Sequence, residues 1–98
     1  MLVGDLDEVT YDLEVDGEPV RRQLHRRVFE RGGWATVAIA YEERGGDGTW
    51  KGAKLALIRL QKVRDAWKKH AAITLRGGDA QALAQTIAGW AELGGDTE

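Results

Sequence analysis

Lysine, arginine and tryptophan side chains concentrate in the middle of this 98-residue chain. All 14 bases lie between residues 21 and 76 beside five acids, whereas residues 1–20 hold seven acids and residues 77–98 hold four, with no base in either end. Cations bind phosphates, and aromatic rings offer flat faces on which nucleic-acid bases stack. The formal net charge of −2 therefore hides a basic segment, and this asymmetry favours a polyanion as ligand.

Two clusters in the basic segment combine both residue types. Four arginines precede Phe29 and Trp34, and a second set of bases surrounds Trp50 and Trp67. Alternate residues of adjacent strands can bring such side chains onto neighbouring rows of a sheet. We therefore predict a nucleic-acid-binding surface made of Arg22, Arg26, Trp34, Trp50, Lys54, Arg59, Lys62, Trp67 and Lys69.

Residues for catalysis or metal binding are scarce. His25 and His70 lie among bases with no carboxylate at motif spacing, so we expect neither to act as a general base or metal ligand. The chain has no cysteine for a disulfide or a thiolate metal site. Three Arg-Gly-Gly triplets, at Arg31, Arg44 and Arg76, stand singly between periodic segments and are predicted to be turns. We expect no enzymatic activity and no cofactor.

The length predicts a single domain over residues 1–98, with residues 1–7 and 94–98 frayed. A chain of this size buries only about 60 to 65% of its unfolded surface, so its core is thin and homodimer formation is expected. No apolar run approaches the roughly 18 residues of a membrane span. We expect a cytoplasmic protein, nucleoid-associated if bacterial, with no membrane partner.

Alternating apolar and polar residues predict several strands. Residues 9–16 alternate and end at a favoured hairpin pair, Asp16-Gly17. Residues 20–29 fit a helix or a strand, and the hairpin signal at 31–33 with the period-two run 35–41 favours the strand. Residues 44–48 are a glycine-rich loop.

Residues 53–70 allow two interpretations. Apolar residues at helical spacing favour a helix, while the alternation of residues 66–75 and a hairpin tip at Arg64-Asp65 favour two strands. Further along, Asp79 can cap a helix that ends near Gly94-Gly95. The overall prediction is an α+β fold with a meander of about five antiparallel strands and one C-terminal α-helix.

Several short segments resemble the positive cofactor four family of transcriptional coactivators and their bacterial and phage relatives, which are related in fold to the Whirly proteins. These segments are RRQLHRRVF at 21–29, GW at 33–34, ATVAIAY at 35–41 and AITL at 72–75. The resemblance implies a curved antiparallel sheet that binds single-stranded DNA and a C-terminal helix that forms the homodimer. The dimer contacts would come from Leu83, Ile87 and Trp90 on one face of that helix.

The sequence and the resemblance together predict binding of single-stranded DNA with little sequence preference, in transcription regulation or in DNA replication and recombination. A protein-interaction module that receives an acidic partner is the alternative from another class. An RNA or double-stranded DNA binder using the same surface is a third. For the acidic N-terminal segment we expect either a solvated strand face or an intramolecular cover for the basic sheet.

Overall fold

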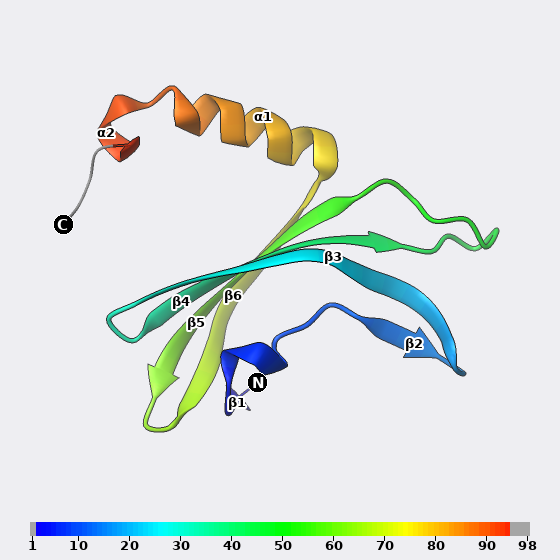
Figure 1. Cartoon of the computed structure of the whole chain (residues 1–98), viewed down its shortest axis with the longest axis horizontal. Coiled ribbons are helices and arrows are strands. Elements are labelled where there is room, and N and C mark those ends of the chain that lie inside the picture. Colours follow the sequence, from blue (N-terminus) through cyan, green and yellow to red (C-terminus); the bar gives the residue numbers. More distant parts are fainter. Residues whose placement is uncertain (1, 95–98) are drawn as a thin grey trace.

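A computed structural model describes residues 2–94 of the protein. These residues form an antiparallel sheet of six strands in the order β1-β6-β5-β4-β3-β2, followed by the C-terminal helix (Figure 1). The elements are β1 (Leu2–Val3), the 3-10 helix η1 (Leu6–Glu8), β2 (Leu13–Val15), β3 (Glu18–Arg31), β4 (Trp34–Glu43), β5 (Lys54–Val63), β6 (Ala66–Arg76), α1 (Gly77–Ala88) and α2 (Ala91–Gly94).

The long strands β3 to β6 form a meander that confirms the predicted hairpins. Asp16 and Gly17 have φ angles of 53° and 81°, and Gly32 and Gly33 have 58° and 84°. Two consecutive positive φ angles match the right-handed twist of hairpin strands, which is why these residue pairs were recognisable as turns. The curled antiparallel sheet with one long C-terminal helix agrees with the predicted fold class.

The ambiguous segment 53–70 belongs to two strands, with Arg64 at the hairpin tip at a φ of 59°. Pairing with β4 explains this outcome. Ala56, Ile58 and Leu60 alternate into the core of the sheet, and this burial outweighs the helix propensity of the surrounding alanines, leucines and lysines.

The N-terminal segment differs from the expected long strand. Only Leu13–Val15 pairs with β3, while Val9 is buried and Tyr11 packs beside the core without strand structure. Residues 2–7, predicted to fray, are also placed: Val3 pairs with Trp67, and Leu6 is buried. We call residues 2–12 the strap.

Helix α1 begins earlier and ends earlier than predicted. Arg76 is its N-cap, so Asp79 lies in the first turn rather than at the cap, and the helix ends at Ala88 with Gly89 as its C-cap. A Cβ atom on Gly77 would lie 2.7 Å from the carbonyl oxygen of Ala53, so only glycine fits where the helix leaves the sheet. Trp90 lies between α1 and α2. The predicted fraying of residues 95–98 falls outside the described residues.

The molecule is a thin slab of 47 × 37 × 17 Å. Figure 1 shows α1 beside the sheet rather than over it, and none of the residues of α1 is buried. Among residues 2–94, no helix is long and apolar enough to cross a lipid bilayer.

Candidate nucleic-acid interface

Strand alternation gives the sheet two unlike faces. Along β4, every second residue from Ala35 to Tyr41 is buried, and the residues between them are partly exposed. We call the buried side the covered face. Its core comprises Ala35, Val37, Ile39 and Tyr41 of β4, Ala56, Ile58 and Leu60 of β5, Trp67 of β6, and Leu6 and Val9 of the strap.

The strap is held on the covered face by Arg26 of β3. Its guanidinium donates to the backbone carbonyls of Leu6 and of Val9, the latter at 3.3 Å, and lies 3.7 Å from the Asp7 carboxylate. The Tyr11 ring packs against the Tyr41 ring, with their centres 4.7 Å apart and their planes tilted by 53°. The strap is therefore an intramolecular cover, but it covers the apolar face of the sheet and occupies one of its cations.

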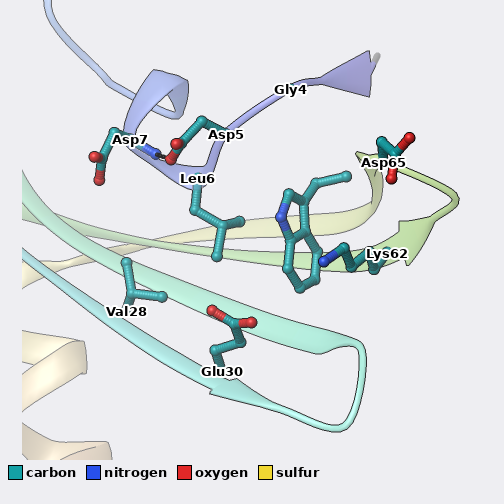
Figure 2. A pocket seen from close by; sticks show the side chains of 9 residues that line it. Gly4, Asp5, Leu6, Asp7, Val28, Glu30, Lys62 and Asp65 are labelled. Atoms are coloured by element: carbon teal, nitrogen blue, oxygen red, sulfur yellow. Dashed lines mark hydrogen bonds between the residues drawn. The ribbon is translucent and has the colours of Figure 1, made fainter.

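Figure 2 shows a cleft on the covered side whose charged lining residues are mostly carboxylates. The cleft has a volume of about 440 Å³ and lies where the strap meets the β5–β6 hairpin. Phosphates are repelled by such a lining, so this cleft is unsuited to a polyanion. The charged residues around it are Asp5, Asp7, Glu30, Lys62 and Asp65, and Leu6, Val28 and Trp67 supply apolar walls.

The opposite side, which we call the open face, carries no buried side chain among the described residues of its rows. Strand register places four rows across β3, β4, β5 and β6 in that order. The rows are Arg31-Trp34-Gln61-Lys68, Phe29-Thr36-Arg59-Ala71, Arg27-Ala38-Leu57-Ile73 and His25-Ala40-Leu55-Leu75, and Arg22 and Glu42 lie beyond the last.

Cation–aromatic pairs stand at both ends of the open face. At one end, the Arg22 guanidinium lies 3.9 Å from the centre of the Trp50 ring and also forms an ion pair with the Glu42 carboxylate. At the other end, Arg59 lies 4.8 Å from the Trp34 ring, and Arg27 lies 4.9 Å from the Phe29 ring. Guanidinium groups and aromatic rings are the two groups with which proteins hold single-stranded nucleic acid.

The predicted binding residues divide between the two faces. The open face holds Arg22, Trp34, Arg59 and, against Arg22, Trp50. Strand register places Arg26, Lys54, Lys62, Trp67 and Lys69 on the side of the covered face.

Trp67 is not retained as a stacking residue. Its side chain is only 5% exposed because it packs in the core, so it offers no surface to a base. Lys62 lies beside Trp67 on the same side of the sheet. Its ammonium is 5.9 Å from the centre of the Trp67 ring, and the residue lines the acidic cleft.

Lys54 is engaged in an ion cluster at the edge of the covered face. Its ammonium donates to Glu43 at 2.9 Å, and Arg21 donates to the same carboxylate. The hydrogen bonds from Lys54 and Arg21 lower the pKa of Glu43, and the hydrogen bond to Glu43 raises the pKa of Lys54. Burial raises the pKa of the adjacent Tyr41 hydroxyl. Lys54 is therefore partnered within the chain.

Two β-bulges explain why spacing alone could not assign the faces. In a regular strand Arg22 and Arg26 would share a face. The register shift between Gln23 and His25 leaves Leu24 as an extra residue, which places Arg22 opposite Glu42 and Arg26 opposite Ile39. A bulge reverses the alternation beyond it, and no residue type in this strand signals one.

The predicted set of binding residues left out several residues of the open face. Phe29 is 53% exposed there, and Arg27 lies beside it. His70 is the extra residue of a second bulge, so its ring reaches 5.0 Å from the Trp34 ring and its Nε2 lies 2.9 Å from Gln61 Oε1. The two-residue spacing of Arg27 and Phe29 indicates that they share a face of the strand. Nothing in the sequence indicates the bulge at His70.

The predicted dimer contacts are exposed in the single chain. Leu83, Ile87 and Trp90 are 40, 37 and 52% exposed, and Leu93 of α2 adds a further apolar side chain. Comparison with protein-family models, curated proteins and solved structures found no match for this chain. The functional interpretation therefore depends on the chemistry of the two faces.

Proposed function

We propose that the protein binds single-stranded DNA with little sequence preference on the open face, in transcription regulation or in DNA replication and recombination. The observation that carries the proposal is the pairing of guanidinium groups with partly exposed rings at both ends of this face, Arg22 with Trp50 and Arg59 with Trp34. Arginines capture the phosphates, and the rings stack on bases.

Single strands fit this surface better than a duplex does. Stacking on Trp34 or Phe29 requires the flat side of a base, which a duplex hides between neighbouring base pairs. A base has the same kind of flat side whatever its identity, so stacking gives little sequence preference. Affinity then depends mainly on the number of neutralised phosphates.

We further propose that the functional form is a homodimer joined through α1. The chain exposes 7006 Å², whereas a compact monomer of its mass exposes about 5,500 Å². Its radius of gyration is 15.5 Å, against about 13 Å for a compact domain of this length. The excess of about 1,500 Å² exceeds the roughly 800 Å² that each partner buries in a standard interface. The apolar face of α1 supplies the contact.

Fluorescence anisotropy with labelled oligonucleotides tests DNA binding. We expect affinity in the order single-stranded DNA above duplex, with log K falling by about 0.7 per neutralised phosphate for each decade of salt. Arg59→Ala should weaken binding and reduce the salt slope by about 0.7. Lys62→Ala removes a cation from the same strand but from the covered side, and should change both quantities much less.

Other outcomes decide against the proposal. An equal loss of affinity in Arg59→Ala and Lys62→Ala would mean that the DNA strand does not bind on the open face. Absence of oligonucleotide binding at low salt would favour a module that receives an acidic protein partner, and a preference for duplex or RNA would overturn the single-stranded DNA assignment.

Light scattering during size-exclusion chromatography tests the dimer. Ile87→Asp puts a charge on the apolar face of α1 and should yield monomers, while Gln85→Asp on another face of the helix should leave the dimer intact. A wild-type protein that elutes as a monomer at micromolar concentration contradicts this part of the proposal.

A further inference from the structure

A hollow of about 790 Å³ lies at the β3–β4 hairpin, where the open face meets the outer edge of β3. Phe29 and Trp34 both line it. They are diagonal neighbours on the same face, because Phe29 pairs with Thr36 and Arg31 pairs with Trp34. The other lining residues are Val28, Glu30, Arg31, Gly32, Thr36 and Arg59.

Both rings have a cation at hand. Arg27 lies against Phe29, and Arg59 lies against Trp34. Arg59 is also fixed in place, since its Nη1 donates to Thr36 Oγ1 at 2.8 Å. The His70 ring stands on the far side of the row, 5.0 Å from the Trp34 ring. The hollow thus combines two aromatic walls with a positioned guanidinium.

We infer that this hollow holds one unstacked nucleobase of the bound strand between Phe29 and Trp34, with the adjoining phosphate on Arg59. The inference rests on the proposed function and adds a defined subsite to it. A planar, apolar-faced ligand is what two neighbouring rings accept.

Cations flank the hollow on both sides. Arg31 lines its β3 side, whereas Glu30, which pairs with the buried Ala35, belongs to the covered side by register. Arg59 on β5 and Lys68 on β6 offer positive charge on the other side. A phosphate on either side of the base is therefore stabilised by a nearby cation.

A fluorescent base analogue tests the subsite. A single-stranded oligonucleotide carrying one 2-aminopurine loses fluorescence when that base stacks on an aromatic ring. With the full-length protein we expect quenching, and Phe29→Leu or Trp34→Leu should each reduce it and weaken the affinity by about tenfold. Both variants keep apolar bulk at partly exposed positions, so folding, checked by circular dichroism, is expected to persist.

Tyr11→Leu is the matched control, because it removes a ring from the covered face. Equal recovery of fluorescence in Tyr11→Leu and Trp34→Leu, or unchanged quenching in both Phe29→Leu and Trp34→Leu, overturns the subsite while leaving DNA binding intact. Absence of any oligonucleotide affinity in the wild-type protein overturns the proposed function instead, so the two failures are distinguishable.

Discussion

The covered and open faces of one sheet contain similar side chains and differ in what lies on them. The strap places Leu6 and Val9 over the covered face, so Ile39 there is fully buried. Ile73 has the same type of side chain as Ile39 but lies on the open face, where it is 54% exposed. Burial on this sheet thus depends on the strap, and the face that the strap leaves open is the one with ring–guanidinium pairs.

The largest expected effect is the difference in stability between substitutions at two isoleucines, Ile39 on the covered face and Ile73 on the open face. Ile39→Ala leaves a cavity in the core and should lower the free energy of unfolding by about 2 to 5 kcal/mol, measured by urea denaturation. Ile73→Ala removes a half-exposed side chain and should cost less than about 1 kcal/mol in dilute protein.

A cost for Ile73→Ala that grows with protein concentration would mean that a second copy covers the open face. This would break the distinction between the faces in solution and would restrict the surface left for DNA.

Two adjacent arginines sharpen the comparison further. Arg26→Ala frees the strap from its carbonyl contacts and should cost about 1.5 to 3 kcal/mol of stability, since hydrogen bonds to charged groups are the strong ones. Arg27→Ala on the open face should leave stability within about 0.5 kcal/mol and weaken oligonucleotide binding instead. Thermal unfolding and anisotropy measure the two effects, and the opposite assignment would contradict the face placement.

The smallest effect concerns the ion cluster of Glu43. Its pKa is lowered below the ordinary value of 4.5, mainly by the hydrogen bond from Lys54. A carboxylate with a lowered pKa contributes its stability fully above pH 4.5 and loses it as the pH falls through the folded-state value. Because the pair is partly exposed, Glu43→Gln should cost less than about 1 kcal/mol at pH 7. Urea midpoints below pH 4.5 should then differ less between variant and wild type than those at pH 7.

Local chemistry made much of the fold predictable. The Asp16-Gly17 and Gly32-Gly33 turns can be recognised from their residue types. Along β4, buried and partly exposed residues alternate without interruption. The course of the strap was not predictable, because Val9 and Tyr11 satisfy an alternating pattern equally well as a strand or as apolar anchors on another surface. Long-range packing decided between the two.

The candidate site was predictable in composition and not in arrangement. The clustering of cations and rings between residues 21 and 76 identified the relevant strands. The bulges at Leu24 and His70 then reassigned faces, moving Arg26 under the strap and bringing His70 to Trp34. Bulges arise from strand pairing, so counting residues along one strand cannot locate them.

Strand β6 passes into α1 at Arg76 and Gly77 with no connecting loop. In the proposed dimer this stiff junction would hold two DNA-binding surfaces at a constant separation. A DNA strand long enough to reach both surfaces would bind by avidity. Its effective concentration at the second surface would be fixed by geometry rather than by a flexible tether. Affinity should therefore rise in a step at one oligonucleotide length, and that length would measure the distance between the two surfaces.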